Sequence, residues 1–425
     1  MAHIIVLGAG IGGMPAAYEL KDELGKEHAI TLINDNDYFQ FVPSNPWVAV
    51  GWRNRNDITF PIEKYLHKKK INFIHAMCHK IDADNSKLEL SDGQTIEYDY
   101  LVIATGPKLY FEELEGSGPE ANSHSICKVN HADAFYNDYK KLLKKGSGTI
   151  VVGAAPFASC FGPAYEFAFI LDSDLRKRKI RDKFHIKYIS SEPYIGHLGL
   201  GGVGDSKSTL ETEMRNHHIE WTVNAKTTKI EDGKIFVDEL SNNGTLAKSH
   251  EIEFDIAMIL PAFFGVDAVA QTEGLCNPRG FVLVDSHQRS PTYKNIYSAG
   301  VCIAIPPVEA THVPTGAPKT GYMIESMVTA VVQNIKSELN GEEPHKEGTW
   351  STLCLTDMGD TGAAFLAIPQ MPPRNVAWFK KGKWVHFAKI AFEKYFIRKM
   401  KKGSSEPFYE KSMLKMMGLT RLKDK

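Results

Sequence analysis

The sequence has few cysteines, no long apolar run and almost no net charge. Its 6 cysteines in 425 residues are too few and too scattered for a secreted scaffold held together by disulfides. No apolar run approaches the roughly 20 residues that a membrane-spanning helix needs. Met1 leads within two residues into a strand-like run with no basic segment before it, so we expect no cleavable signal peptide. These absences exclude a membrane-spanning protein and a small disulfide-rich domain.

The cysteines also lack the spacings of paired-thiol and metal motifs. No C-x-x-C or C-x₄-C pair is present, which excludes a redox dithiol formed by near neighbours in the sequence. No cluster of Cys and His has zinc-ligand spacing, so no metal site is expected. Because 43% of the residues are hydrophobic, the chain has enough apolar material for two or three folded domains.

The formal net charge of −1 conceals an uneven distribution of charge. Residues 374–425 contain 15 Lys and Arg but only 4 Asp and Glu, and the rest of the chain is acidic. A segment of one sign indicates a partner of the opposite charge, which is either nucleic acid or anionic lipid.

The first 35 residues predict a dinucleotide-binding unit. An apolar strand at 3–7 precedes a glycine-rich turn, a helix at 14–24 and a second strand at 29–33. We expect the turn to bind a pyrophosphate, because glycine permits a tight turn and close approach of the backbone. Its residues are Gly8, Ala9, Gly10, Ile11, Gly12 and Gly13. The second strand ends in Asn34 and Asp35, and which of them holds the ribose is open.

Two later segments repeat the pattern of a buried strand that ends in glycine. Residues 100–106 end in Thr105-Gly106, and residues 295–300 end in Gly300. Together with the first turn, they resemble the three-part FAD signature of the flavoprotein disulfide reductase superfamily, whose members have two dinucleotide-binding domains. In most such enzymes an Asp follows the last glycine and binds the ribityl chain, but here Val301 stands in that place. The resemblance implies FAD as the cofactor.

A second strand–turn–helix unit lies at 149–171, with the helix expected from Cys160 to Leu171. Members of the superfamily that use NAD(P)H have a second G-x-G-x-x-G here, of which only Gly153 remains. The following alanines add Cβ atoms near the turn, and Pro156 has no backbone N–H for a phosphate. We therefore expect no nicotinamide site. Further strands are expected at 185–190, 252–260 and 281–284, and a helix at about 319–339.

Cys160 differs from the other cysteines because it is expected to open a helix. A thiol near a helix N-terminus has a stabilised thiolate, which makes it nucleophilic near neutral pH. Glu166 lies six residues further on, so the sequence does not place both side chains on one helix face. Cys354 lies in an apolar strand at 350–355, and a redox pair with Cys160 requires the fold to bring them together. Cys276 and Cys302 are expected to be inert.

Four long segments resemble those of the bacterial type I sulfide:quinone oxidoreductases, and the similarity extends over essentially the whole chain. They are residues 38–47 (YFQFVPSNPW), 158–166 (ASCFGPAYE), 191–199 (SEPYIGHLG) and 314–322 (PTGAPKTGY). The resemblance implies that FAD takes two electrons from hydrogen sulfide and passes them to a membrane quinone, either ubiquinone or menaquinone. Cys160 and Cys354 would then be a redox pair linked by a sulfur bridge, on which sulfane sulfur or polysulfide grows.

The resemblance also implies roles for other residues. Cys127 would lie near the flavin, and whether it bonds to the flavin is open. Glu166, His131 and His197 match positions proposed for proton transfer, with a purely structural role as the alternative for each histidine. Lys319 would stabilise the negative charge of the reduced flavin ring. The residues expected to contact FAD beyond the first turn and the ribose position are Val42, Pro43, Cys78, Thr105, Gly106, Gly300, Val301, Lys319 and Gly321.

The basic tail predicts amphipathic helices at a membrane surface. Apolar residues recur every three or four positions from Trp384 to Tyr395, and a second apolar stripe rich in methionine follows Gly403. Basic amphipathic helices insert into the interface of an anionic bilayer, whereas bulky aliphatic side chains have no use against phosphates, so no nucleic acid is expected. A helical hairpin packed on the body of the protein is the alternative. By the resemblance, Phe392 and Tyr409 sandwich the quinone ring, unless they only anchor the tail in lipid.

The predicted fold is α/β, with two Rossmann-like dinucleotide-binding domains of the FAD type and a C-terminal amphipathic helical region. Residues 1–115 and 289–340 form the FAD-binding domain, and 116–288 form the second domain, with a degenerate nucleotide site and Cys160. Residues 341–373 carry Cys354, and 374–425 bind the membrane and quinone. The protein is expected to be a peripheral membrane protein. The face of the membrane and the oligomeric state, a homo-oligomer included, are open.

Three other functions share parts of this pattern. A type II NADH:quinone oxidoreductase needs the nucleotide-binding turn that residues 153–156 lack. The flavin subunit of a sulfide:cytochrome c dehydrogenase does not need a lipid-binding tail. A non-catalytic flavin-binding membrane adaptor has no reason to keep both Cys160 and Cys354.

Overall fold

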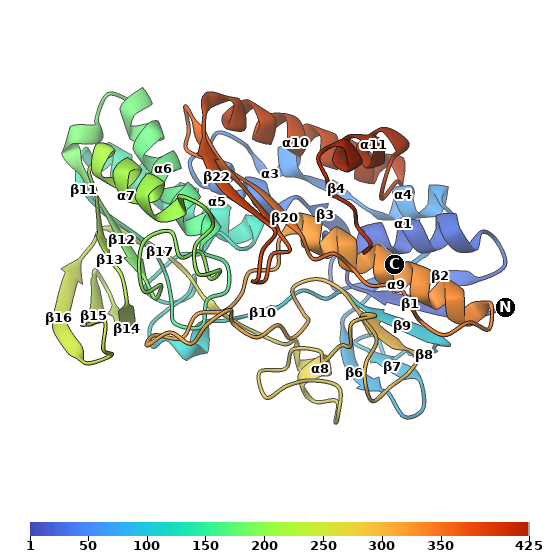
Figure 1. The fold of residues 1–425 in the computed structure, drawn as a ribbon. Coiled ribbons are helices and arrows are strands. Elements are labelled where there is room, and N and C mark those ends of the chain that lie inside the picture. The colour runs from blue at the N-terminus through green and yellow to red at the C-terminus, as the bar shows by residue number, and fades with distance from the viewer. Residues whose placement is uncertain (424–425) are drawn as a thin grey trace.

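The apolar run at the N-terminus forms the central strand of a five-stranded parallel sheet. The computed structural model describes residues 1–423, so the last two residues of the predicted tail, 424–425, lie outside it. Strand β1 (His3–Leu7) lies between β2 (Ala29–Asn34) and β9 (Tyr100–Ile103), and β5 (Asn72–His75) and β19 (Ile296–Ser298) form the edges. The three central strands are largely apolar and buried, as in a parallel sheet that is covered on both faces (Figure 1).

Two long helices pack together beside this sheet. Helix α1 (Gly13–Leu24) follows β1, and α9 (Gly321–Leu339) follows β19. A small antiparallel sheet, β6 (Cys78–Asp82), β7 (Lys87–Leu90) and β8 (Thr95–Glu97), completes the unit. The elements predicted for the first dinucleotide-binding unit are therefore confirmed.

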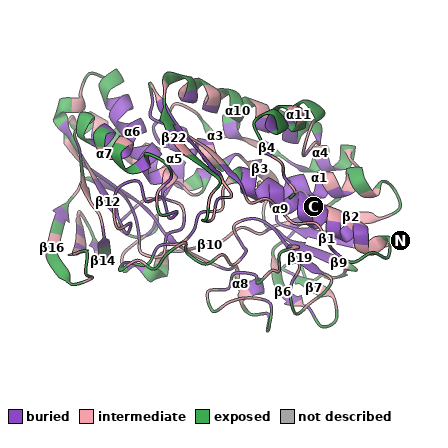
Figure 2. Ribbon diagram, in the orientation of Figure 1, coloured by how far each residue is buried: buried purple, intermediate pink, exposed green. Residues whose placement is uncertain are grey.

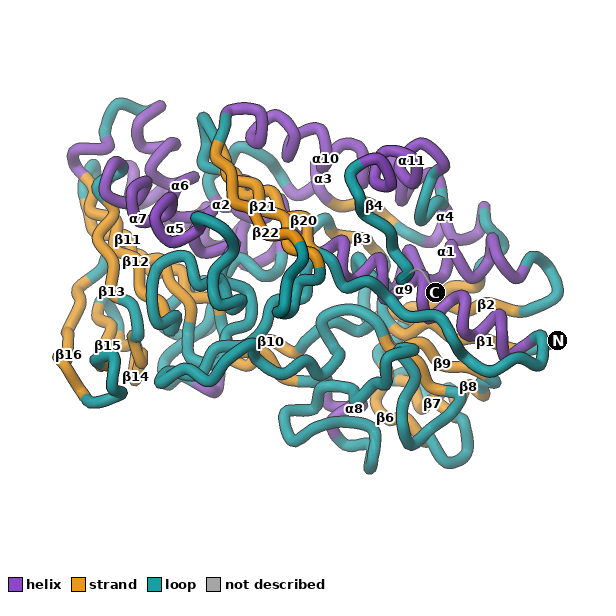
Figure 3. Tube along the Cα trace, in the orientation of Figure 1, coloured by secondary structure: helices purple, strands orange, loops and turns teal. Residues whose placement is uncertain are grey.

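The second parallel sheet has the strand order β13-β12-β11-β17. Its strands are β11 (Gly148–Ala154), β12 (Phe184–Ser190), β13 (Ile219–Thr222) and β17 (Ile256–Leu260), and the associated helices are α5 (Val129–Lys145), α6 (Gly162–Lys177) and α7 (Ser206–Asn216). An antiparallel sheet of β14 (Ala225–Glu231), β15 (Lys234–Leu240) and β16 (Leu246–Glu253) lies beside them (Figure 3). The predicted pair of Rossmann-like units is thus confirmed.

Two sequence predictions about strands are wrong. The single strand expected at 252–260 is the end of β16 and the whole of β17, which belong to different sheets. They are separated by Asp255, whose carboxylate accepts hydrogen bonds from the Thr149 N–H (2.7 Å) and from Lys145. Residues 281–284 form no strand, because Val282 makes only isolated bridges with Cys276 and Ile303.

The C-terminal region begins with an antiparallel sheet and ends in two helices. The sheet consists of β20 (Thr352–Asp357), β21 (Gly362–Ile368) and β22 (Val376–Lys381), and the helices are α10 (Lys383–Lys402) and α11 (Phe408–Met416). Helix α10 packs on β20 and β21 and runs along one edge of the molecule (Figure 1). The remaining elements are short: β3 (Tyr38–Gln40), β4 (Thr59–Pro61), β10 (Lys108–Tyr110), β18 (Ala262–Phe264), α2 (Asn45–Ala49), α3 (Arg55–Ile58), α4 (Glu63–Lys68), α8 (Asp267–Ala270) and single turns at Val42–Ser44, Phe111–Glu113 and Arg181–Lys183.

The tail helices pack on the body through charged side chains. In α10, Lys389, Glu393 and Lys399 are each less than 5% exposed. Glu393 accepts from Arg53 Nε at 3.0 Å, and Lys399 donates to Glu325 at 2.8 Å. The exposed large apolar side chains of the tail are Trp384, Phe387, Phe392, Phe408, Tyr409, Met413, Met416 and Met417. Buried and exposed residues alternate along α10 (Figure 2). Its inward face carries these charged side chains beside Val385, Phe396 and Met400, and its outward face leaves large apolar side chains exposed among lysines.

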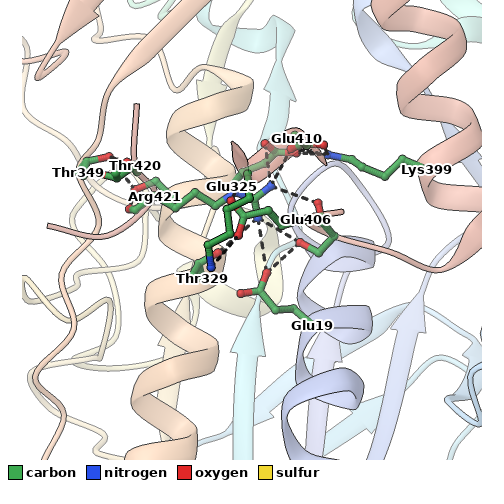
Figure 4. A network of polar contacts seen from close by, with 12 residues as sticks. Glu19, Glu325, Thr329, Thr349, Lys399, Glu406, Glu410, Thr420 and Arg421 are labelled. Carbon is green, nitrogen blue, oxygen red and sulfur yellow. Dashed lines mark hydrogen bonds and ion pairs between the residues drawn. The ribbon is translucent and has the colours of Figure 1, made fainter. Parts of the chain in front are cut away.

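Arg421 holds the end of the tail against the body of the protein. Its guanidinium is buried among the carboxylates of Glu19 (3.6 Å), Glu325 (3.2 Å), Glu406 (3.1 Å) and Glu410 (3.1 Å) (Figure 4). These groups come from α1, α9 and the tail itself, so one side chain ties three parts of the chain together. Within residues 1–423, no helix is long and apolar enough to cross a bilayer.

Candidate active site

The glycine-rich turn after β1 has two glycines that packing requires and one that faces open space. Gly8 has a φ of +109°, and a Cβ there would lie 2.4 Å from the Ala104 carbonyl oxygen. A Cβ at Gly13 would lie 1.8 Å from the Gly8 carbonyl oxygen, whereas one at Gly10 would meet no atom within 4 Å. The backbone at Gly10 is therefore open to a ligand at the N-terminus of α1, as a pyrophosphate requires.

The two candidates for the ribose contact have different surroundings. The amide oxygen of Asn34 accepts the Ala9 N–H at 2.8 Å, so this side chain braces the glycine turn. Asp35 is exposed, and within residues 1–423 its carboxylate accepts only from the neighbouring Asn36 side chain, at 3.1 Å. Of the two, Asp35 has the side chain that is free to bind a hydroxyl group.

The other predicted FAD segments converge on the start of α1. Gly300 has a φ of +101° and adjoins Ile324 of α9, and a Cβ at Gly12 would lie 3.3 Å from the same Ile324 side chain. Gly321, the first residue of α9, has no atom within 4 Å of its Cβ position. The N-termini of α1 and α9 thus lie at adjacent turns whose backbone is open to a ligand. This arrangement fits a cofactor that has anionic groups.

Lys319 connects this region with the cysteines. Its side chain is partly buried, with Nζ 4.8 Å from the centre of the Phe281 ring. Burial lowers the pKa of Lys319 to about 8, and the nearby thiols of Cys302 and Cys160 oppose that shift. Lys319 is therefore a cation that lies between the start of α9 and the thiols of Cys302 and Cys160.

The fold brings three distant cysteines to one place. Cys160 lies in the loop between β11 and α6, Cys354 in β20, and Cys127 just before α5. All are free thiols, and Cys354 and Cys127 lie close enough to raise the pKa of Cys160. Burial is the largest cause, and it raises the pKa of Cys160 to about 12 and those of Cys354 and Cys127 to about 11.

The predicted stabilisation of the Cys160 thiolate is wrong. Helix α6 begins at Gly162, so Cys160 precedes the helix instead of opening it. Loss of water around the buried sulfur outweighs the helix dipole, because a thiolate in an apolar site has little to solvate it. Ionisation of this cysteine therefore requires a nearby base.

A buried carboxylate beside the cysteines has the properties of such a base. Glu166 in α6 pairs with Lys389 of α10 and accepts the backbone N–H of Asp357. Burial raises the pKa of Glu166 to about 7, against the opposing effect of Lys389. Its charge also raises the pKa of both Cys160 and Cys354, which shows that the carboxylate lies close to both sulfurs. The sequence alone left open whether Glu166 faces Cys160, and the structure brings them together.

The two predicted histidines have separate surroundings. His197 Nδ1 accepts the Gly199 N–H at 3.1 Å, so Nε2 carries the proton and donates to Glu309 at 2.8 Å. Burial lowers the pKa of His197, and its contacts hold the 191–199 loop in place. His131 in α5 lies beside Phe111, with ring centres 6.0 Å apart, and burial lowers its pKa to about 4. Among the contacts of the described residues, neither ring is bonded to a cysteine or to Glu166.

The second nucleotide-binding turn is closed by its own hydrogen bonds. The Ala155 N–H donates to Leu260 O at 2.9 Å and the Phe157 N–H donates to Pro314 O at 2.7 Å. Glu192, just after β12 where an acid would hold a ribose, is fully buried and accepts from Tyr165 Oη at 2.8 Å. The backbone N–H groups of this turn and the carboxylate of Glu192 are therefore already hydrogen-bonded within the protein.

The predicted quinone residues lie at the exposed side of the tail. The Phe392 ring is 5.9 Å from the ring of Phe41, which adjoins the predicted flavin contacts Val42 and Pro43. The Tyr409 ring is 6.1 Å from that of Tyr395. Phe392 and Tyr409 are 42% and 59% exposed, so both are accessible from the apolar surface of the tail.

The remaining cysteines are held by local contacts. Cys78 begins β6 and donates to Lys80 O at 3.4 Å, and burial raises its pKa to about 12. Cys302 is buried against Ser298 Oγ at 3.4 Å. Sequence reasoning missed Lys389 and Asp357 as members of the site, because nothing in their spacing relates them to Cys160 or Glu166.

Comparisons with known proteins agree with this geometry. The family model of the pyridine nucleotide-disulphide oxidoreductases matches residues 2–332. The chain is 42% identical over 418 residues to the sulfide-quinone reductase of Aquifex aeolicus (strain VF5), covering 97% of this chain and 94% of that protein. The X-ray structure of the sulfide:quinone oxidoreductase from Aquifex aeolicus matches with a TM-score of 0.95 and 40% identity, covering 100% of this chain and 98% of that one. A type II NADH:quinone oxidoreductase of Staphylococcus aureus is 38% identical over only 165 residues, 36% of this chain and 40% of that protein.

Proposed function

The chain belongs to the pyridine nucleotide-disulphide oxidoreductases and, within them, to the sulfide:quinone oxidoreductases, and we propose that Cys160 and Cys354 are its redox pair. The observation that carries this proposal is the meeting of the two sulfurs, nearly 200 residues apart in sequence, beside the buried carboxylate of Glu166. A flavoprotein fold with two neighbouring thiols, one of which raises the pKa of the other, suits a two-electron reaction of sulfide.

The flavin is FAD in this proposal. Gly10 and the N-terminus of α1 would hold the pyrophosphate, Asp35 would bind the ribose, and Lys319 would stabilise the negative charge of the reduced flavin. When bound, the flavin accepts two electrons from the cysteine site and gives them to the quinone. Val301 in place of an acid leaves the ribityl chain to backbone groups beside Gly300.

The cysteines carry out the sulfur chemistry. Hydrosulfide attacks one sulfur of the oxidised pair, breaks the bond between the cysteines and leaves a persulfide on one residue and a thiolate on the other. The persulfide gives up its proton, and its outer sulfur then bonds to the other cysteine, a two-electron oxidation for which a bound flavin would be the oxidant. Each turnover thus adds one sulfane sulfur and releases one proton and one electron pair.

Glu166 accepts the proton of this step. It lies close to both sulfurs and is buried, and with a pKa of about 7 it is divided between its two forms at neutral pH. A base with this pKa takes a proton from the persulfide and then returns it to solvent at little cost. His197, which is committed to Gly199 and Glu309, supports the neighbouring loop.

The quinone reaches the protein from the membrane. The exposed apolar side chains of α10 and α11, among them Phe387 (67% exposed) and Phe408 (84% exposed), insert into the lipid interface while neighbouring lysines meet anionic headgroups. Phe392 and Tyr409 contact the quinone ring at this surface. The same surface therefore anchors the protein and admits its second substrate.

NADH is not the electron donor in this proposal. The backbone N–H groups of Ala155 and Phe157 and the acid Glu192 are all occupied by partners within the protein. A nucleotide would have to displace these bonds before it could bind.

The test compares two cysteine variants under anaerobic conditions. We expect Cys354→Ala to bind FAD normally but to lose reduction of the flavin by sulfide, because the sulfur bridge has no second attachment. Cys276→Ala, a change outside the site, should be reduced like the unchanged protein. Reduction of the Cys354→Ala flavin at the normal rate would overturn the redox-pair proposal.

A further inference from the structure

Helix α10 contributes two basic side chains to a buried pair of carboxylates beside the cysteines. Lys389 Nζ contacts Glu166 Oε1, and His386, one turn earlier, bonds Asp357 Oδ1 at 2.7 Å. Lys389, Glu166 and Asp357 are each at most 5% exposed. The membrane-docking helix therefore reaches directly into the region of Glu166.

Among the described residues packed around Glu166, Lys389 is the cation that contacts its carboxylate. Asp357, at the end of β20, adds a second negative charge, and its other oxygen accepts from Trp47 Nε1 at 2.7 Å. The cysteines 160 and 354 are the other titratable groups near the carboxylate. Without Lys389, two buried carboxylates would face each other with only a histidine on the far side of Asp357.

We propose that Lys389 is a positioning residue of the sulfide-oxidising site: it favours the ionised form of Glu166 and orients its carboxylate beside Cys354, and thereby makes the membrane-docking helix part of that site. This inference rests on the proposed function, in which Glu166 accepts the proton from the sulfur species. It means that movement of α10 changes sulfide oxidation as well as access of quinone.

The physical basis is the cost of a buried charge without a partner. Burial raises the pKa of Glu166, and Lys389 lowers it. Lys389 also lowers the pKa of Cys354. Removing the lysine thus shifts both groups in the same direction, toward the protonated form. The proton acceptor is then available only at higher pH.

The experiment measures the rate of flavin reduction by sulfide across the neutral pH range, with the full-length FAD-loaded protein in detergent. For Lys389→Met we expect the acid limb of the profile to move upward by about 1 to 3 pH units, the shift that one nearby opposite charge produces. The rate below that limb then falls about tenfold or more and recovers at higher pH. Ionisation of sulfide is common to all variants and does not contribute to the difference.

Two further variants separate an electrostatic role from a structural one. Lys394→Met, which removes an exposed lysine of the same helix, should leave the profile unchanged. Lys389→Arg, which keeps the charge, should return the limb toward its normal position. In a Glu166→Gln background, Lys389→Met should have a much smaller effect than in the unchanged protein, because only Cys354 remains for the lysine to act on.

The outcomes distinguish this inference from the proposed function. An unshifted profile, or a loss that is the same at every pH, overturns the role of Lys389 while sulfide still reduces the unchanged protein. Independent, multiplicative losses from the Glu166 and Lys389 changes also overturn it. If sulfide fails to reduce the unchanged protein, the proposed function itself is wrong.

Discussion

Replacement of Arg421 by methionine should detach the end of the tail. Arg421 ties α1, α9 and the tail together through Glu19, Glu325, Glu406 and Glu410 (Figure 4). Removal of one partner from a buried ion pair costs about 3–5 kcal/mol, because the remaining charges stay buried without compensation. Since about 1.4 kcal/mol corresponds to a factor of ten, the lower figure increases the opening equilibrium of this segment by about a hundredfold.

The loss of stability in the Arg421→Met variant should depend on pH in a defined direction. In the unchanged protein, Arg421 and Lys399 lower the pKa of Glu325, so its contribution is present above the unfolded pKa and is lost in acid. Without Arg421, the buried carboxylates bind protons more tightly when folded than when unfolded. The deficit of the variant should then grow as pH rises and be smallest in acid.

Hydrogen exchange of the α11 amides, residues 408–416, measures this opening directly. Lys423→Met is the control, since Lys423 makes an exposed ion pair with Glu347 at 2.7 Å, a kind of contact that contributes about 0–1 kcal/mol. We expect exchange in α11 to accelerate about a hundredfold for Arg421→Met at neutral pH, compared with the unchanged protein at the same pH. Equal exchange in the two variants would refute the reasoning.

The other predictions concern the cofactor turn and the tail. Gly10→Val should fold but purify with little flavin, because its side chain enters only the space that the protein leaves open for the cofactor. Gly13→Val should not fold, because its Cβ would lie 1.8 Å from a carbonyl oxygen. Flavin absorbance and thermal unfolding of the two variants test these predictions. Phe387→Glu should weaken co-sedimentation with anionic vesicles while leaving flavin reduction by sulfide unchanged, and undiminished binding would count against lipid insertion. Deletion from Trp384 onward should release the protein from membranes and abolish quinone reduction, and a truncated protein that stays with the membrane would contradict the anchoring role.

Elements governed by local contacts could be predicted from the sequence. The turn from Gly8 to Gly13 follows from neighbouring apolar runs, and the steric demand at Gly13 arises from Gly8, only five residues away. The prediction of a strand at 281–284 is wrong because strand formation there is not a local matter: the pairing of Val282 depends on Cys276 and Ile303. Whether such a segment forms a strand is decided by which neighbours the fold supplies.

The candidate site could be predicted only in part. The nearness of Cys160 and Cys354 depends on how β20 packs against α6, which no local pattern encodes. The orientation of the tail helices could not be predicted from the sequence either, because an amphipathic pattern defines two faces but does not determine which of them packs on the protein. Here the inward face carries Lys389 and Glu393, which pair with Glu166 and Arg53 far away in the sequence, together with apolar side chains.

Anaerobic absorbance of the purified flavoprotein, with sulfide and NADH added in separate cuvettes, tests the central claim most directly. We expect sulfide alone to bleach the flavin band and a quinone analogue to restore it, because both half-reactions pass through the flavin. NADH should leave the band unchanged, because Ala155, Phe157 and Glu192 are already bonded within the protein. Bleaching by NADH but not by sulfide would contradict the account.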